Sequence, residues 1–240
     1  LGLGLDDVRK INPAIIYARG TGQGVRGEEA TRGGYDLATY WTRCGIAHML
    51  KEPTQAWPPL QRPAFGDIVG GFAIAAGVAA ALFKRATTGE PSVVDVSLLG
   101  LAAWQLSPDI VAAGLLGEEN LPRFSHEEMP NPIVNTYPTS DGRFVALVML
   151  QADRFWPEVC ELIERPDFVE DPRFATAGAR FENRVECVNE LKKAFLTRPL
   201  AEWRERMKGL EGVWSVVQTP GEVLTDPQVS RKHAELAVTP

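Results

Sequence analysis

The sequence predicts an α/β protein with a Rossmann-like, parallel α/β large domain and a smaller α+β domain. Strand-like and helix-like patterns alternate through the first half of the chain, which is typical of a parallel sheet covered by helices. Beyond residue 117 the pattern changes to paired strand-like runs followed by amphipathic helices. A chain of 240 residues is long enough for one large domain or two modest ones.

The first half of the chain alternates short strands, glycine-containing loops and helices. Glycines at positions 20, 22, 24 and 27 predict a flexible loop. Four prolines between residues 51 and 66 exclude a regular helix and predict an extended connector. The expected elements, in order, are a helix over 5–11, a strand over 14–18, helices over 35–47 and 68–86, a strand over 92–97 and a helix over 98–116.

The second half begins with a polar, proline-containing stretch that is typical of a linker. Two strands around a Ser-Asp-Gly turn follow it, and the tail carries another strand and a short helix. Three amphipathic helices are expected near 152–164, 178–196 and 199–208. We therefore assign 1–117 to part of the large domain, 118–131 to the linker, 132–210 to the small α+β domain and 211–240 to a segment returning to the large domain.

The composition is that of an ordinary soluble protein, with 45% hydrophobic and 23% charged residues. A net charge of −6 gives no general attraction to nucleic acid or anionic membranes, so neither is an expected partner. The spacing of Cys44, Cys160 and Cys187 indicates neither a disulfide framework nor a zinc site, and a reduced cytoplasm fits best. The apolar run over 68–83 is rich in glycine and alanine, so we expect a buried helix rather than a membrane span.

Asp67 stands directly before this run and has two interpretations. An aspartate ahead of a helix commonly caps it, which contributes about 1 kcal/mol of stability. Alternatively, the free N–H groups at a helix start stabilise negative charge, and an ionised carboxylate there can serve as a nucleophile. Gly66 before it, and Gly70 and Gly71 after it, remove side chains that would block a bulky substrate.

Other chemical motifs are weaker. His48, His126 and His233 are scattered, and their spacing indicates neither a metal site nor a catalytic triad. The G-x-G-x-G string over 20–24 lacks the glycine spacing and the immediate helix of a dinucleotide fingerprint, so a nicotinamide site is not expected.

The string GDIVGGFAIAAGVAAALFKRATTGEPSVVDVSLL resembles the signature of the class III CoA-transferase family, the CaiB/BaiF type. The strings LGLGLDDVRKINPAIIYARGTGQG and GGYDLATYWTRCGI are similar to segments upstream of that family's active site. YPTSDGRFVALVML and DPRFATAGARFENRVE are similar to landmarks of its small domain. The resemblance therefore extends over nearly the whole chain.

The resemblance implies roles for individual residues. Asp67 falls on the catalytic aspartate that Gly66 precedes, and Tyr35 falls on an aromatic position lining the CoA site. Leu98 falls on an apolar position beside the cofactor, and Gln23 lies near the reacting acyl group. A basic residue is common where this chain has Gly33, and the adjacent Arg32 is a candidate substitute.

The implied activity is transfer of CoA from an acyl-CoA donor to a carboxylic acid acceptor, through a covalent aspartyl-CoA intermediate on Asp67. Coenzyme A is then the implied cofactor, as the acyl-CoA substrate, without a metal. The family also implies an interlocked homodimer.

Two alternatives stay open. The α-methylacyl-CoA racemases of the same superfamily have a histidine in the place of Tyr35, and a tyrosine, with an ordinary pKa near 10, is a poor substitute for proton exchange. The other alternative is a non-catalytic CoA-binding fragment, because the chain starts downstream of the family's nucleotide-site portion and stops before its C-terminal return.

Overall fold

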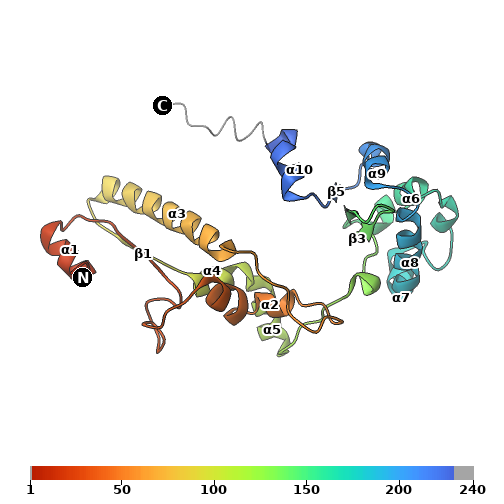
Figure 1. The fold of residues 1–240 in the computed structure, drawn as a ribbon. Helices are drawn as coiled ribbons and strands as arrows, with labels where there is room; N and C mark the ends of the chain where they lie inside the picture. The colour runs from red at the N-terminus through yellow and green to blue at the C-terminus, as the bar shows by residue number, and fades with distance from the viewer. Residues whose placement is uncertain (1, 230–240) are drawn as a thin grey trace. The chain divides into compact units, whose positions relative to one another are not determined.

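The computed structural model describes residues 2–229, and the chain divides between Arg123 and Phe124 into two compact units. The division falls inside the stretch expected to be a linker. The first unit contains helices, a π-helix η1 and a parallel strand pair (Figure 1). Its elements are α1 (Leu5–Ile11), β1 (Tyr17–Thr21), η1 (Asp36–Arg43), α2 (Ile46–Met49), α3 (Phe65–Thr88), β2 (Val93–Ser97), α4 (Leu98–Gln105) and α5 (Ser107–Leu116).

Strands β1 and β2 pair in parallel, with Tyr17 opposite Val93 and Thr21 opposite Ser97. Helix α3 lies between them in the sequence and packs on both strands, as a crossover helix does. Gly77 permits this packing, because a Cβ there would lie 2.5 Å from a Val94 methyl carbon. The unit is therefore mixed α/β with a parallel strand pair, which confirms the predicted class at this level.

Three elements of this unit have bounds that differ from those expected from the sequence. A turn in which the Ile15 N–H bonds the Asn12 carbonyl at 3.2 Å delays the first strand to residues 17–21. The helix expected over 35–47 becomes the π-helix η1 and the short α2, separated by Gly45 at φ 95°. The helix expected over 98–116 is two helices, α4 and α5, bent by 68°.

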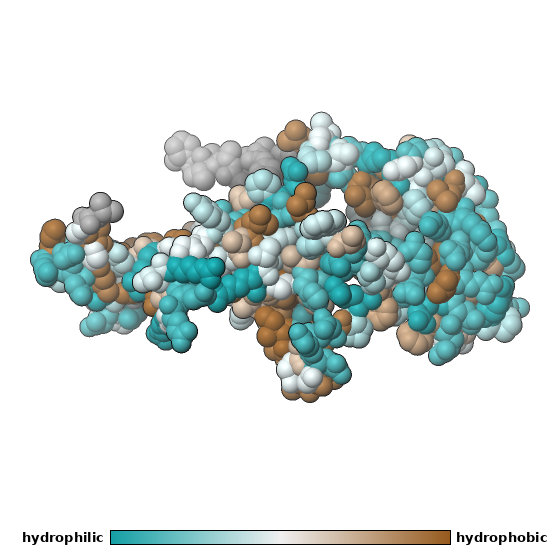
Figure 2. Space-filling view, turned by 60° about the horizontal axis from the view of Figure 1, so that its bottom comes forward, coloured by the Kyte–Doolittle hydropathy of each residue, from teal (hydrophilic) through white to brown (hydrophobic). Residues whose placement is uncertain are grey.

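The prediction that the apolar helix is buried is wrong for the single chain. In α3 only Gly66, Gly70 and Ala81 are buried. Phe72 and Phe83 are 79% and 71% exposed, and hydrophobic residues are visible on the surface in Figure 2. By length and composition alone α3 could cross a membrane. The mean hydropathy of its 18-residue apolar window is 1.8, and 17% of that window is buried in the structure. Composition therefore does not decide what covers this helix.

The second unit has an antiparallel sheet and a cluster of helices (Figure 1). The sheet has the order β3-β4-β5. Its elements are the 3-10 helices η2 (His126–Glu128), η3 (Pro166–Val169) and η4 (Met207–Gly209), strands β3 (Val134–Pro138), β4 (Phe144–Val148) and β5 (Trp214–Val216), and helices α6 (Ala152–Leu162), α7 (Ala177–Glu182), α8 (Arg184–Phe195), α9 (Leu200–Arg206) and α10 (Pro220–Thr225).

Strand β5 belongs to the segment expected to return to the large domain, yet it pairs with β4 in this sheet. The small unit therefore extends past residue 210. Helix α10, which follows β5, also contacts this unit, because Arg143 donates to Glu222 at 2.6 Å. The assignment of the chain after α10 stays a prediction, and residues 230–240 lie outside the described residues.

The two units bury cores of different size. The second unit packs an extensive aromatic core, in which Phe195 stacks on Tyr137 at 5.1 Å and meets Trp203 at 4.8 Å between ring centroids. The core of the first unit is small and centres on η1, α2 and α4, with Tyr40, Trp41, Ile46, Ala47 and Ala102 as its buried members. Much of the first unit's apolar surface is therefore unburied in one chain.

Candidate functional site

The carboxyl ends of β1 and β2 lie side by side because the strands are parallel and in register. Beyond β1 the chain enters the glycine loop, and beyond β2 it enters α4. The Leu99 N–H donates to the Gly22 carbonyl at 3.0 Å and ties the loop to the helix. Ser97 caps α4 by accepting the Gly100 N–H at 3.0 Å. In α/β sheets this is the edge at which ligands bind.

The start of α3 is fixed by a residue from another element. Ala64, at the N-cap position, has no side-chain acceptor and a left-handed φ of 66°. The buried carboxylate of Asp36 in η1 takes over this role, accepting the Gly66 N–H at 3.0 and 3.1 Å. It also accepts the Gln61 amide at 2.8 Å. A neighbouring helix therefore caps α3 from outside.

Gly66 is required by this close approach. A Cβ at position 66 would lie 2.4 Å from Cγ of Tyr40 and 2.5 Å from an Asp36 carboxylate oxygen. Real Cβ atoms do not approach other heavy atoms so closely, and α3 could not sit against η1 with any other residue there. Gly66 therefore acts by letting α3 dock, and it is not among the residues that line the pocket described next.

Asp67 is the third residue of α3 and does not serve as its N-cap. Its side chain is exposed and makes no hydrogen bond or ion pair with any residue from 2 to 229. Because Asp36 caps the helix, the Asp67 carboxylate is left available at a helix N-terminus, where N–H dipoles stabilise negative charge. The capping interpretation of Asp67 does not hold.

Asp67 lines a pocket of about 370 Å³ at the carboxyl ends of the two strands. The pocket brings Asp67 and Leu98, both expected site residues, together with glycines of the loop. Its other walls are small or apolar, so Asp67 is the one ionisable group among the residues that line it. The lining residues are Gly20, Thr21, Gly22, Gly34, Asp67, Gly70, Gly71, Ile74, Val96 and Leu98.

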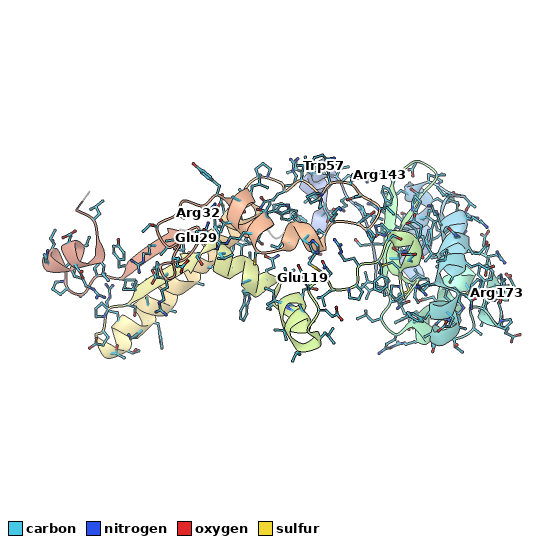
Figure 3. All side chains as sticks on the ribbon, turned by 90° about the horizontal axis from the view of Figure 1, so that it is seen from below. Glu29, Arg32, Trp57, Glu119, Arg143 and Arg173 are labelled. Atoms are coloured by element: carbon cyan, nitrogen blue, oxygen red, sulfur yellow. The ribbon has the colours of Figure 1, made fainter. Side chains whose placement is uncertain are left out.

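Besides Gly66, three expected site residues do not line this pocket. Tyr35 is 85% exposed beside Gly34. Gln23 is held by Thr39, whose hydroxyl oxygen accepts its amide at 3.2 Å, and by Arg43, which donates to it at 2.6 Å. Arg32 is ion-paired with Glu29, and the two side chains lie together in Figure 3.

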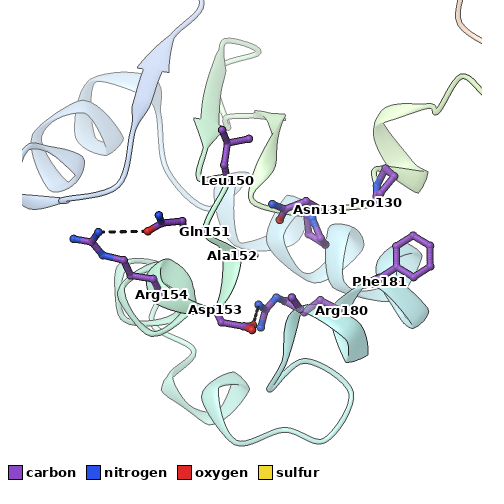
Figure 4. A pocket seen from close by; sticks show the side chains of 11 residues that line it. Pro130, Asn131, Leu150, Gln151, Ala152, Asp153, Arg154, Arg180 and Phe181 are labelled. Atoms are coloured by element: carbon purple, nitrogen blue, oxygen red, sulfur yellow. Dashed lines mark hydrogen bonds and ion pairs between the residues drawn. The ribbon is translucent and has the colours of Figure 1, made fainter. Parts of the chain in front are cut away.

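A larger pocket of about 450 Å³ lies in the second unit (Figure 4). Its buried Arg180 donates to Asp153 at 2.5 Å and to the Phe174 carbonyl at 2.6 Å. Arg154, another lining residue, is paired with Glu211 at 3.3 Å. Two nitrogens of the Arg180 guanidinium are thus matched by anionic or carbonyl oxygens, whereas its buried Nε has no hydrogen-bond partner among the described residues. The pocket around Asp67, with its unpaired carboxylate, is the better candidate for chemistry.

The remaining ionisable residues do not extend the site. His48 lines a separate cavity of about 180 Å³, His126 hydrogen bonds Asn135 at 2.7 Å, and His233 lies outside the described residues. No group of three or more potential metal ligands occurs within residues 2–229. Burial raises the pKa of the Cys44 thiol, which disfavours the thiolate that a nucleophile would need.

One ion pair links β1 to β2. Arg19 of β1 and Asp95 of β2 lie opposite each other in the register, and Nη2 of Arg19 donates to Asp95 at 3.2 Å. The hydrogen bond from Arg19 holds the pKa of Asp95 below its usual range. This pair contributes to the strand alignment on which the pocket depends.

Sequence reasoning missed several pocket residues and the anchor of α3. Thr21, Ile74 and Val96 carry no motif, although Thr21 and Val96 lie at strand ends, where sites are expected. Ile74 follows Asp67 by seven residues, a spacing that puts both on one helix face. No sequence pattern indicated that Asp36 caps α3, because Gly66, whose N–H it accepts, lies 30 residues further along the chain.

Comparisons with known proteins agree with this geometry. The sequence profile of CoA-transferase family III matches residues 1–238. The chain is 29% identical over 229 residues to an (R)-2-hydroxy-4-methylpentanoate CoA-transferase of Clostridioides difficile, covering 95% of this chain and 56% of that protein. It is 31% identical over 236 residues to a probable fatty acyl-CoA transferase of Mycobacterium tuberculosis, covering 92% of this chain and 59% of that protein.

A crystal structure of that M. tuberculosis protein superimposes with a TM-score of 0.79 at 28% identity, covering 97% of this chain and 60% of the solved one. The chain thus spans between half and two thirds of the length of these relatives. From the match along almost its entire length, the chain belongs to CoA-transferase family III.

Proposed function

We propose that the protein is a CoA-transferase in which Asp67 is the nucleophile. One observation carries the proposal: an Asp67 carboxylate without a partner among the described residues lies at the start of α3, in a glycine-lined pocket at the carboxyl ends of two parallel strands. The carboxylate oxygens of structural aspartates at helix starts normally accept hydrogen bonds from the first backbone N–H groups of the helix. Here Asp36 performs that task, which leaves Asp67 available for chemistry.

The reaction consists of balanced acyl transfers without oxidation or reduction. An Asp67 oxygen attacks the donor's thioester carbonyl; a C–O bond forms, the C–S bond breaks and the thiolate leaves with the electron pair, giving a mixed anhydride. The thiolate then attacks the Asp67 carbonyl carbon, forming an aspartyl thioester and releasing the first acid as its carboxylate. An acceptor carboxylate repeats the two steps in reverse and restores Asp67.

The pocket residues suit this chemistry. Glycines at 20, 22 and 34 present backbone rather than side chains, so a thioester can approach Asp67 closely. A pocket of about 370 Å³ would hold the reacting thioester and the acyl group, with the rest of CoA outside it. Tyr35 and Arg32 would contact that outer part of the substrate, and Gln23 is proposed to lie near the reacting acyl group. The apolar walls Ile74, Val96 and Leu98 favour an aliphatic or aromatic acyl group. The relatives include an (R)-2-hydroxy-4-methylpentanoate CoA-transferase and a probable fatty acyl-CoA transferase.

The test traps the activated carboxylate. The protein is incubated with a panel of acyl-CoAs and hydroxylamine, which converts an activated aspartyl carbonyl to a hydroxamate, and the modified peptide is identified by mass spectrometry. We expect modification of Asp67, dependent on the acyl-CoA, and none in Asp67→Asn. Asp109→Asn is the matched control, because Asp109 is likewise the third residue of a helix, α5, but lines another cavity.

Binding of acyl-CoA without modification of Asp67 would sink the transferase mechanism. Exchange of the α-proton of the acyl group into deuterium oxide would then favour the racemase alternative. No observation at the site favours that alternative over transfer, since Tyr35 does not line the pocket with Asp67.

The protein is also proposed to be a homodimer. The support is the apolar surface of α3, on which Phe72 and Phe83 are largely exposed. Exposed apolar area of this kind marks an interaction surface. Light scattering after size exclusion would give a dimer mass, and a double Phe72→Ser, Phe83→Ser variant would give a monomer. Leu224→Ser, at an 80% exposed leucine of α10, is the control, and an unchanged dimer in the double variant would contradict the proposal.

Two broader assignments remain proposals. A large domain over 1–117, a linker over 118–131 and a small domain that starts at 132 are proposed to follow the family pattern, with the chain after α10 returning to the large domain. A cytoplasmic location is proposed because Cys44, Cys160 and Cys187 are all free thiols. Fractionation of cells that express the tagged protein tests the location.

A further inference from the structure

Helix α3 contains four glycines before its C-terminal turn, and two of them, Gly66 and Gly77, have neighbours that explain their size. A Cβ at Gly66 would collide with η1 and one at Gly77 with β2, whereas a Cβ at Gly70 would make only an ordinary van der Waals contact with Leu101 at 3.6 Å. Gly71 has still more space around it. A Cβ there would meet no heavy atom of the described residues within 4 Å, so packing does not account for a glycine at this position.

Glycine also has a cost inside a helix. After proline it is the least favourable residue in a helix interior, because it loses the most backbone freedom. Gly71 is the seventh residue of the 24-residue α3, far from either cap. Without a conformational or packing reason, alanine would be the expected residue. Within the single chain, the reason that remains is the space that an absent side chain leaves in the pocket that Gly71 lines.

The position of that space follows from helix geometry. Residues 67, 71 and 74 follow the i, i+4, i+7 spacing, so they lie on one face of α3. Side chains in a helix tilt toward its N-terminus, and a side chain at 71 would extend over the turn that carries Asp67. Gly71 is therefore a gap in the wall between the Asp67 carboxylate and the Ile74 side chain, and all three line one pocket.

We propose that Gly71 determines which acyl groups the enzyme accepts, by providing the channel along which the acyl chain runs from Asp67 toward Ile74. This inference rests on the proposed function, because the acyl group is taken to be bonded to Asp67. The acyl carbons nearest the carbonyl would lie over Gly71, so residue 71 limits branching at these carbons. Residue 74 limits the length of the acyl chain beyond them. Ile74 closes the channel, and its Cδ1 lies 3.4 Å from the place of a Cβ on Gly20.

The experiment compares kcat/KM and equilibrium affinity for acetyl-CoA, isobutyryl-CoA and hexanoyl-CoA in the full chain, with isotopically labelled acetate as acceptor so that transfer from acetyl-CoA is also visible. Gly71→Ala is expected to lower kcat/KM for isobutyryl-CoA and hexanoyl-CoA by about 10-fold or more relative to acetyl-CoA. Ile74→Ala is expected to act in the opposite direction and raise the hexanoyl to acetyl ratio. Both variants are also compared with the wild type by thermal unfolding and by light scattering.

Gly114→Ala is the matched control. Gly114 lies inside α5, is exposed, and a Cβ there would likewise meet nothing within 4 Å, but it does not line the pocket. Both alanine variants should raise the melting temperature by a few degrees through helix propensity. Only Gly71→Ala should change the ratios between donors.

Two results would overturn the inference. An equal loss for all three donors would mean that position 71 does not select acyl size. A lower melting temperature or a monomeric Gly71→Ala would mean that the glycine serves contact with a second chain. Failure of the proposed function would give a different result. If the wild type binds the donors without transferring CoA, the proposed function is wrong, and the ratios of affinity between the donors still test the role of Gly71.

Discussion

At the scale of single residues, Asp36 performs the capping that Asp67 could have performed, and the Asp67 carboxylate is left without a partner among the described residues. Asp36 is 8% exposed and spends its oxygens on the Gly66 N–H and on Gln61, whereas Asp67 is exposed toward the pocket. Sequence reasoning could propose Asp67 as a nucleophile or a cap but could not choose between them. The deciding residue is distant in the chain, and a single sequence contains no local pattern that pairs it with α3.

We expect Asp36→Ala to destabilise the first unit by about 2 kcal/mol, since it removes a cap and leaves a buried N–H without an acceptor. Asp36→Asn keeps one acceptor oxygen and should lose clearly less. Urea unfolding followed by tryptophan fluorescence measures both, with Asp109→Asn as a control for charge. Equal stability of the wild type and Asp36→Ala would show that α3 does not depend on this anchor.

At the scale of elements, local patterns predicted the regular helices and the hairpin well, but they did not predict the π-helix η1 or the bend between α4 and α5. The hairpin around Ser-Asp-Gly forms as expected, with Gly142 at φ 72° in its turn. The helix expected over 98–116 breaks because Pro108 cannot donate an N–H and Leu106 leaves the helical region. Apolar residues run through both halves, so hydrophobicity alone gave no sign of the bend.

Helix α10 is held to the sheet of the second unit by charge. Thr219 and Glu222 form a capping box, and Arg143 donates to Glu222 at 2.6 Å and to the Val217 carbonyl at 3.1 Å. The hydrogen bond from Arg143, followed by one from Thr219, lowers the pKa of Glu222 from 4.5 to about 2.

Because this pKa is lowered on folding, the stabilisation is complete above pH 4.5 and is lost as the pH falls toward 2. The difference in melting temperature between the wild type and Glu222→Gln should therefore be constant near neutral pH and shrink below pH 4.5. Glu205→Gln, which removes an exposed carboxylate paired with Lys208, controls for the loss of one charge. A difference that grew on acidification would contradict the assignment.

At the scale of the whole molecule, the two units differ in what a single chain can bury. The second unit has a continuous core of large side chains, whereas the first has five buried hydrophobic residues in its main cluster and an exposed apolar helix. The alternation of strands and helices was enough to predict the α/β class. It could not predict that α3 would be exposed, because burial depends on surfaces that a pattern along one chain does not describe.

Hydrogen exchange should reflect this difference. We expect the amides of β4 and α8, which carry the core residues Val145, Leu147 and Leu191, to exchange most slowly. Amides of α3 should exchange faster at low protein concentration and slow down as the concentration rises, if the proposed dimer covers that helix. Protection in α3 that is independent of concentration and equal to that of α8 would argue against both expectations.

The crossover through α3 also has a kinetic consequence. Arg19 and Asp95, which pair across β1 and β2, are 76 residues apart in the chain, whereas the β3–β4 hairpin closes over a short turn. A long loop must be closed, at a cost in chain entropy, before the contacts that offset this cost can form. Parallel pairing is slow for that reason. The sheet that is synthesised second should thus form first, and the pocket around Asp67 should be the last part of the described chain to be assembled.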